Sequence, residues 1–414
     1  MQNFWDQRYA QRVQRMRSSA IRELLKITEH PDAISFAGGL PAPDVFPVEK
    51  IAAVTQKILR EHSTQALQYG PTEGYRPLRE LLAQQMSHDG LSISVDNIII
   101  TSGSQQGLDL LARIFVDPDD YILTESPTYM GALQVFAPYE PRYITIPSDE
   151  GGVRTDELEE ALQHNRPKFM YILPNFQNPS GRTLTLQRRQ HLLEIVNRYG
   201  IPVLEDDPYS QLRFAGEALL SLLDLTGSDY SSAQSGYQGK IIHLNTFSKI
   251  LAPGLRLGWT VAPAGVISKL VQAKQGTDLH TSSFNQLIAY ELLREGFFEK
   301  HIPLIRQKYH ERRNVMLAAL EEFFPAGTQW THPEGGMFLW ITLPAGMDSS
   351  ELLREALEQE KVAFVPGHAF HPNGGGENTM RLSFSNATPE RIRDGIERLG
   401  RVLQKKMEQA TVRA

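Results

Sequence analysis

Lys249 is the residue whose type and setting point most clearly to chemistry. It directly follows Ser248, just after the apolar stretch Ile241–Leu244, and Arg256 comes seven residues later, behind a Pro-Gly pair. A partly desolvated lysine has a lowered pKa, so its amine can form a Schiff base with an aldehyde. A nearby guanidinium can hold a phosphate. The segment therefore favours an enzyme that uses a phosphorylated aldehyde, pyridoxal phosphate.

Three adjacent acids end a second apolar stretch, Pro202–Asp206, and two interpretations are open for them. Glu205, Asp206 and Asp207 could bind magnesium, but the chain has no glycine-rich phosphate loop followed by Lys and Ser or Thr. A pyridine nitrogen needs one carboxylate to stay protonated, and Asp206 fits that role. Tyr209 could then donate to the phenolic oxygen of the cofactor.

A possible phosphate site follows the apolar stretch Ile98–Thr101. Gly103, Ser104 and Gln105 lead into a predicted helix, whose free N-H groups and positive end suit an anion. An ordinary helix N-cap explains the same residues.

Further polar or aromatic residues follow other strands, and each also has a structural explanation. Asn178 precedes a proline and is typical of a turn, while Tyr129 could lie over an aromatic ring or simply pack. Arg381 stands inside the apolar stretch Met380–Phe384, where a charge is costly unless paired. It predicts either a structural ion pair or a clamp for a substrate carboxylate.

The secondary-structure elements around these residues must position them. Short apolar runs alternate with helical segments along the chain, which predicts a mainly parallel sheet covered by helices on both faces. In such sheets ligands bind beyond the carboxyl ends of the strands. One unit shows the pattern: Thr185 caps a helix that Gly200 ends, before the next strand. The seven predicted strands are Ile98–Thr101, Tyr121–Glu125, Arg142–Ile146, Phe169–Leu173, Pro202–Asp206, Ile241–Leu244 and Leu257–Val261.

After about residue 281 the pattern changes to long polar helices and shorter strands. This predicts a second, smaller α+β domain. The boundaries we predict are an N-terminal arm with a helix over residues 1–45, a large cofactor-binding domain over 46–285 and a small C-terminal domain over 286–414.

The composition of the chain limits the kinds of partner that we expect it to bind. The 414 residues are 41% hydrophobic with a net charge of -6, so neither nucleic acid nor a membrane span is predicted. There is no cysteine, which excludes disulfides and cysteine-type zinc sites. The arginine-rich start resembles a mitochondrial transit peptide, but Ile21–Ile27 continues as a helix without a cleavage site. We therefore predict a cytoplasmic protein.

Taken together, these residues make the chain resemble the fold type I pyridoxal-phosphate aminotransferases of class I/II over nearly its whole length. The matching segments are Tyr69-Gly70-Pro71 with Gly74, Gly103-Ser104-Gln105, Pro127-Thr128-Tyr129, Gln177-Asn178-Pro179-Ser180-Gly181, Asp206 with Tyr209, Ser248-Lys249 with Arg256, and Arg381.

The resemblance implies a role for each of these residues. Lys249 bonds the cofactor aldehyde and later moves the substrate proton, while Asp206 pairs with the pyridine nitrogen. Contacts to the ring and its oxygen are implied for Asn178, Tyr209 and Tyr129. Phosphate contacts are implied for Gly103, Ser104, Gln105, Ser248, Arg256 and, from a second subunit, Tyr69.

Within the class the chain resembles the 2-aminoadipate aminotransferase branch, in Ser19–Lys26, Ser35–Pro41, Gln272–Gly276 and Gly374–Asn378. The branch implies 2-aminoadipate, glutamate, leucine or aromatic amino acids as donors, a 2-oxo acid such as 2-oxoglutarate as acceptor, and an obligate homodimer. It implies substrate contacts for Arg381, Asn178, Gly39, Tyr69 and Arg22. Arg22 is expected to meet a distal carboxylate, or else to be a solvated helix charge.

Other functions stay open at this point. The same apparatus would serve another pyridoxal-phosphate reaction, such as a lyase or decarboxylase. A transcriptional regulator is disfavoured because only about 40 residues precede the aminotransferase-like body and the charge is mildly acidic. A nucleotide-binding or structural α/β protein would give a colourless preparation that does not depend on Lys249.

Overall fold

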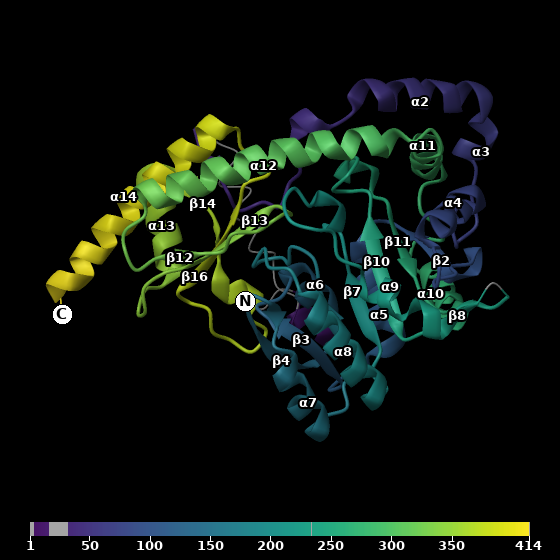
Figure 1. The fold of residues 1–414 in the computed structure, drawn as a ribbon, viewed down its shortest axis with the longest axis horizontal. Helices are drawn as coiled ribbons and strands as arrows, with labels where there is room; N and C mark the ends of the chain where they lie inside the picture. Colours follow the sequence, from purple (N-terminus) through teal and green to yellow (C-terminus); the bar gives the residue numbers. More distant parts are fainter. Residues whose placement is uncertain (1–3, 16–31, 233, 414) are drawn as a thin grey trace.

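The central sheet determines the architecture. The computed structural model describes residues 4–15, 32–232 and 234–413, and within them this sheet has eight strands in the order β2-β11-β10-β7-β6-β3-β4-β5 (Figure 1). The strands are β2 (Ile98–Thr101), β3 (Tyr121–Ser126), β4 (Arg142–Asp149), β5 (Gly152–Val153), β6 (Phe169–Ile172), β7 (Val203–Asp206), β10 (Ile241–Thr246) and β11 (Gly258–Val261).

Most of this sheet is parallel. Strands β10, β7, β6, β3 and β4 pair in parallel, whereas β11 runs antiparallel to both β10 and β2. Each of the seven predicted strands is present with ends shifted by at most three residues, and the two-residue β5 adds an antiparallel edge. The predicted fold class is confirmed.

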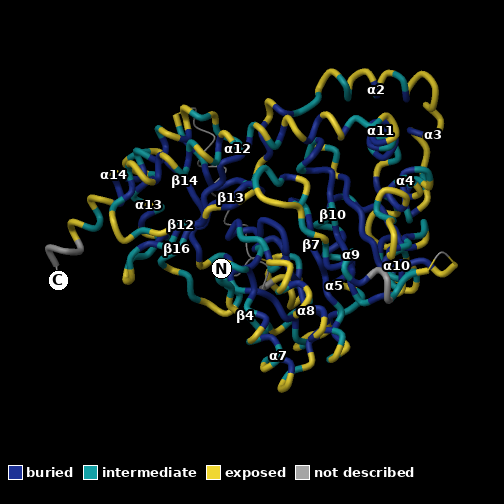
Figure 2. Tube along the Cα trace, in the orientation of Figure 1, coloured by how far each residue is buried: buried dark blue, intermediate teal, exposed yellow. Residues whose placement is uncertain are grey.

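The strands are apolar runs because helices cover the sheet. Every residue of β2, β6, β7 and β11 is buried, and Figure 2 shows the dark blue core running through the sheet. Helix α8 begins after Thr185, whose side chain accepts the Arg188 N-H, and ends at Gly200, whose φ of 71° is left-handed. The helices around the sheet are α2 (Val48–Glu61), α3 (Ser63–Leu67), α4 (Arg76–Met86), α5 (Ser104–Phe115), α6 (Met130–Phe136), α7 (Thr155–His164), α8 (Leu186–Tyr199), α9 (Leu222–Tyr230), α10 (Ala264–Gln275) and α11 (Ser283–Arg294).

A second, smaller sheet lies at the C-terminal side of the molecule. Its antiparallel strands follow the order β12-β13-β16-β15, and the long helix α12 runs from the neighbourhood of α11 to this sheet (Figure 1). The elements are α12 (Phe297–Phe323), β12 (Gln329–Trp330), β13 (Phe338–Thr342), α13 (Ser349–Glu360), β14 (Val362–Ala363), β15 (Val365–Pro366), β16 (Thr379–Ser383) and α14 (Pro389–Arg413).

The N-terminal part of the described chain joins this second sheet region, because β1 (Ile34–Ser35) pairs in parallel with β14. The domain boundaries at residues 45 and 285 stay a prediction. Among the described residues, no helix combines the length and apolarity needed to cross a membrane. The remaining short elements are β8 (Ser231–Ser232), β9 (Gly236–Tyr237) and the 3₁₀ helices at Gln11–Arg15, Pro43–Val45, Val95–Asn97, Ala137–Tyr139, Ser210–Leu212, Pro253–Leu255 and Gly367–Phe370.

Candidate active site

A cavity of about 140 Å³ opens beyond the carboxyl ends of β2, β6, β7 and β10. This is the edge at which parallel strands bring their following residues together. Nine of the predicted site residues line it. The lining residues are Ser104, Gln105, Tyr129, Leu173, Asn178, Asp206, Pro208, Tyr209, Thr246, Ser248, Lys249, Pro253 and Arg256.

Lys249 enters the cavity from the turn that follows β10. Its Nζ donates a hydrogen bond to the carbonyl oxygen of Gly39 at 3.0 Å, and the described residues give it no ion-pair partner. Burial and the positive charges of Arg381 and Arg256 lower the pKa of Lys249 to about 8. A substantial fraction of the amine is therefore neutral near physiological pH, and a neutral amine can act as a nucleophile or a base.

Asp206 ends β7 on the floor of the cavity. Its Oδ2 accepts a hydrogen bond from the hydroxyl of Tyr171 at 2.9 Å, but its buried Oδ1 has no partner among the described residues. Burial raises the pKa of Asp206 to about 7. A buried acceptor without a donor is unfavourable, so Oδ1 fits a protonated pyridine nitrogen of the bound cofactor.

The two acids beside Asp206 point elsewhere. Glu205 lies on the other face of the strand, where it accepts the N-H groups of Leu222 and Leu223 at the start of α9. Its Oε2 lies 2.9 Å from Nδ1 of His243. Burial lowers the pKa of His243, but the hydrogen bond and charge of Glu205 outweigh that effect and raise it to about 9. The pair is thus an internal ion pair beneath the site.

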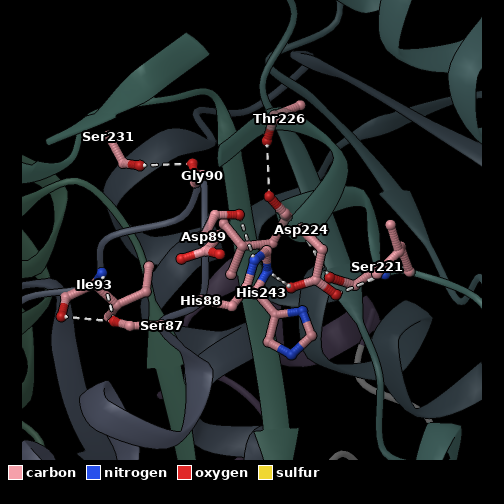
Figure 3. Close-up of polar contacts among 12 residues, drawn as sticks. Ser87, His88, Asp89, Gly90, Ile93, Ser221, Asp224, Thr226, Ser231 and His243 are labelled. Carbon is pink, nitrogen blue, oxygen red and sulfur yellow. Dashed lines mark hydrogen bonds and ion pairs between the residues drawn. The ribbon is translucent and has the colours of Figure 1, made fainter. Parts of the chain in front are cut away.

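Local contacts around this ion pair support a structural role. Figure 3 shows His243 near the cap of α9, in which Ser221 Oγ accepts the N-H of Asp224 at 2.9 Å. Asp207 accepts from the side-chain amide of Asn175 at 3.0 Å. Among the described residues no cluster of three acids or histidines is arranged to hold a metal ion. The arrangement favours a carboxylate for a ring nitrogen over the magnesium interpretation.

An anion-binding corner forms another part of the cavity. Helix α5 begins at Ser104 and presents its first N-H groups there. Gly103 has a φ of +80°, and a Cβ at this position would lie 2.5 Å from Nη2 of Arg256, so only glycine allows the guanidinium so close. Ser248 also lines this corner and is oriented by the hydroxyl of Thr246, which donates to its Oγ at 2.9 Å. Backbone N-H groups, a hydroxyl and a guanidinium suit a phosphate.

Arg381 is buried on β16 beside the cavity. Its Nη1 donates to Asn178 Oδ1 at 2.7 Å and its Nη2 to the carbonyl oxygen of Ala37 at 2.5 Å. The guanidinium also lies over the rings of Phe338 and Phe370, 4.3 and 5.1 Å from their centres. Burial lowers the pKa of Arg381 to about 10. The part of the chain that the structure describes gives it no carboxylate partner, so the structural ion pair is not found.

Two tyrosines, Tyr129 and Tyr209, also line the cavity. Tyr209 is buried, and Nζ of Lys249 lies 6.0 Å from the centre of its ring. Tyr129 has its hydroxyl 3.5 Å from Oε1 of Gln105, close to the start of α5. Burial raises the pKa of both hydroxyls, so both stay protonated and can donate hydrogen bonds.

Five predicted residues are not among those that line this cavity: Gly103 and Arg381, described above, and Gly39, Tyr69 and Arg22. Gly39 reaches it only through its carbonyl oxygen, and a Cβ there would lie 2.8 Å from the ring of Phe338. Tyr69 is 79% exposed and packs edge-on against His280, with 5.7 Å between ring centres. Arg22 lies outside the described residues.

Two buried residues of the site, Tyr171 and Glu125, were not predicted from the sequence. Tyr171, which orients Asp206, stands in an apolar strand and looks like a packing residue. Glu125 is buried at the end of β3 and accepts the N-H of Leu173 at 3.0 Å, and burial raises its pKa to about 8. An acid at the end of an apolar strand was the available signal for Glu125, the same signal that identified Asp206.

Comparisons with known proteins agree with this geometry. Residues 37–399 match the family model of aminotransferase class I and II. The chain is 46% identical over 409 residues to the aromatic-amino-acid aminotransferase 1 of Thermococcus litoralis, covering 97% of this chain and 95% of that protein. It is 46% identical over 400 residues to the 2-aminoadipate transaminase of Thermus thermophilus, covering 97% of each.

A solved structure extends the likeness to the whole fold. The alpha-aminoadipate aminotransferase of Thermus thermophilus, complexed with N-(5'-phosphopyridoxyl)-L-leucine, superposes with a TM-score of 0.90 at 44% identity, covering 98% of this chain and 100% of that one. The buried lysine, the unpartnered carboxylate oxygen and the anion-binding corner are what a pyridoxal-phosphate site requires. The chain belongs to the class I and II aminotransferases, which are pyridoxal-phosphate enzymes.

Proposed function

We propose that this aminotransferase moves the amino group of 2-aminoadipate, glutamate, leucine or an aromatic amino acid to a 2-oxo acid, with 2-oxoglutarate as acceptor, by a ping-pong mechanism. The observation that carries the proposal is Arg381, a buried guanidinium with no carboxylate partner in the described chain, next to Lys249's cavity. A substrate α-carboxylate would complete it. The relatives named for 2-aminoadipate and aromatic amino acids, and the leucine adduct, support the donor range.

Bound pyridoxal phosphate supplies an aldehyde that condenses with amines and a ring that accepts electrons from the substrate α-carbon. Lys249 moves the proton of the reaction. With a pKa of about 8, its neutral amine would take the proton from the substrate α-carbon and then deliver it to the C4' carbon of the cofactor. Asp206 Oδ1 accepts from the ring nitrogen and keeps it protonated. Asn178 and Tyr209 would hold the ring oxygen, and Tyr129 would pack against the ring.

The anion-binding corner takes the phosphate. Gly103 gives Arg256 room beside the backbone of α5, while Ser104 and Gln105 supply N-H groups and polar side chains. Ser248 adds a hydroxyl. We assign the phosphate to this corner because the first N-H groups of α5, a hydroxyl and a guanidinium meet there and would together hold an anion.

A homodimer in which Tyr69 reaches the neighbouring site is part of the proposal. Tyr69 is 79% exposed and Leu67 73% exposed, although both are large and apolar. Neither residue lines the cavity of its own chain. A second copy that covers this surface would bury both and bring Tyr69 to the partner's phosphate.

Mixed dimers test the crossing directly. Tyr69→Ala and Lys249→Ala are each prepared alone, then unfolded together and refolded. If Tyr69 crosses, the mixed dimer contains one site with both residues intact and regains activity. If Tyr69 serves its own chain, no site in the mixture is intact and activity does not return.

Half-reaction rates test the substrate proposal. The enzyme with cofactor is mixed with 2-aminoadipate, glutamate, leucine, valine, tyrosine or kynurenine, and loss of the cofactor's visible absorbance is followed together with formation of the 2-oxo acid. Transamination predicts one oxo acid per cofactor without an acceptor. Carbon dioxide or an elimination product instead would favour the lyase or decarboxylase alternative, and equal rates for all donors would contradict the proposed range. A distal-carboxylate role for Arg22 and a cytoplasmic location stay predictions.

A further inference from the structure

Lys274 is buried but takes no part in the site described above. It stands on α10 within Gln272–Gly276, one of the segments that resemble the 2-aminoadipate branch, and none of its side chain is exposed. Its Nζ donates to Oε1 of Gln106 at 2.6 Å and to both oxygens of Asp278 at 2.8 and 2.9 Å. All three hydrogens of the ammonium group therefore have acceptors.

The acceptors of Lys274 also hold the start of α5. Oε1 of Gln106 accepts the backbone N-H of Ser102 at 2.8 Å. Oδ2 of Asp278 accepts from the hydroxyl of Ser102 at 3.0 Å and from the amide of Gln106 at 2.7 Å. We call Lys274, Asp278 and Gln106 the Lys274 cluster. The cluster bonds Ser102, which precedes Gly103–Gln105, and includes Gln106, which follows it.

The loop that the cluster holds has little room to move. Its carbonyl at Ser102 lies 3.4 Å from Nη2 of Arg256, and a Cβ on Gly258 would lie 2.7 Å from the backbone nitrogen of Ser104. The N-H groups of an anion site act only when they are aimed at the ligand, and a displacement of about 1 Å weakens such contacts strongly. A fixed support behind the loop is therefore useful to the site.

We propose that the Lys274 cluster is a positioning device for the cofactor phosphate: it fixes the Ser102–Gln105 loop from behind, so that Lys274 sets phosphate affinity without touching the cofactor. This inference rests on the proposed assignment of that loop to the phosphate. The ammonium suits the task because its three N-H donors bond an amide oxygen and both oxygens of a carboxylate at once.

Single residues of the cluster can be substituted because water reaches Asp278. Asp278 keeps 28% of its side chain exposed, so removing Lys274 leaves a hydrated carboxylate rather than a buried unpaired charge. Lys274→Met keeps the length and apolar stem of the side chain. Gln106→Met leaves the Lys274 and Asp278 pair intact but removes the bonds of Gln106 to both of them and to the Ser102 N-H. Lys269→Met on the exposed side of α10, where Lys269 bonds Gln272, is the matched control.

Cofactor affinity measured with and without the phosphate group tests the proposal. Each apoenzyme is titrated with pyridoxal phosphate and with pyridoxal, following visible absorbance. We expect Lys274→Met to weaken pyridoxal phosphate binding by about 10- to 100-fold, in the range seen when a residue that orients a ligand-binding group is lost. Gln106→Met should move in the same direction, pyridoxal should bind as in wild type, and Lys269→Met should change neither.

The outcomes separate this inference from the proposed function. If wild type prefers pyridoxal phosphate to pyridoxal but both cluster variants keep that preference, the inference is wrong and the loop assignment stands. If the variants weaken both compounds equally, the cluster has a structural role only, and the inference is also wrong. If wild type has no preference for the phosphorylated compound, the loop assignment fails and the inference fails with it. Should Lys274→Met not fold, Gln106→Met decides the question.

Discussion

Two buried lysines in this molecule have opposite surroundings. Nζ of Lys249 bonds a single carbonyl oxygen and is close to two guanidinium groups, which with burial lower its pKa to about 8. Nζ of Lys274 bonds an amide and a carboxylate. Burial also lowers the pKa of Lys274, but Asp278 opposes that effect. Lys249, which has no ion-pair partner among the described residues, is available for chemistry, whereas Lys274, which is paired with Asp278, holds structure.

Removing each of the two lysines in turn is the strongest test of this comparison. Lys249→Ala should lower kcat/KM for any amino donor by more than about 10⁴-fold, because it removes the proton carrier and the cofactor attachment together. Lys274→Met should instead cost about 1–3 kcal/mol in unfolding free energy, through lost hydrogen bonds, with kcat at saturating cofactor close to wild type. Steady-state kinetics and urea unfolding check both variants.

The result that would contradict the comparison is specific. A Lys274→Met enzyme that folds, is saturated with cofactor and still has lost most of its kcat would mean that the paired lysine takes part in the reaction. The absorbance band of the Schiff base between cofactor and lysine, present in Lys274→Met and absent in Lys249→Ala, checks which lysine carries the cofactor.

Removing one of the cations near Lys249 gives the next largest effect. Arg381→Met should reduce kcat/KM for amino acids by about 10³-fold, since two charge-assisted hydrogen bonds to a carboxylate are lost, and the pKa of Lys249 should rise because Arg381 lowers it. Methionine fits between Phe338 and Phe370. Arg393→Met is the control, because Arg393 also lies over a phenyl ring, 4.9 Å from the centre of Phe323, but at the surface. Unchanged kcat/KM in Arg381→Met would contradict the substrate clamp.

The two lysines also differ in how well the sequence predicts their roles. Asp206 and Lys249 were predicted because each follows an apolar strand, and parallel strands bring such ends together whatever the details of packing. The seven strands were predicted for the same reason, since fully buried strands are continuous apolar runs. Of the eight strands described in the central sheet, only the two-residue β5 was missed.

The role of Lys274 could not be predicted in this way. Its burial depends on Gln106, which is 168 residues away in the sequence, and an isolated lysine on a helix normally predicts an exposed position. The pairing of Arg381 with Asn178 spans 203 residues, so the choice between an ion pair and a free clamp also needed the structure. Tyr171 was not predicted for a different reason. Its hydroxyl bonds Asp206, but a tyrosine inside an apolar strand looks like a packing residue.

The pH dependence of stability gives the smallest effect and the finest test of Lys249. Its folded-state pKa of about 8 lies below the ordinary value of 10.5, so between these pH values the unfolded chain holds a proton that the folded chain has lost. Apoenzyme stability, relative to Lys249→Met, should therefore rise as pH increases from 8 to 10.5, by at most about 3 kcal/mol. Urea unfolding of both proteins across this window measures the difference.

The same experiment in an Asp206→Asn background sharpens the result. The charge of Asp206 raises the pKa of Lys249 and partly opposes the effects of burial and of the two arginines. Without that charge the pKa falls further, so the rise in stability should begin at a lower pH and span a wider range. A flat difference in both backgrounds would mean that Lys249 titrates like an ordinary lysine. Its lack of an anionic partner would then not distinguish it from Lys274.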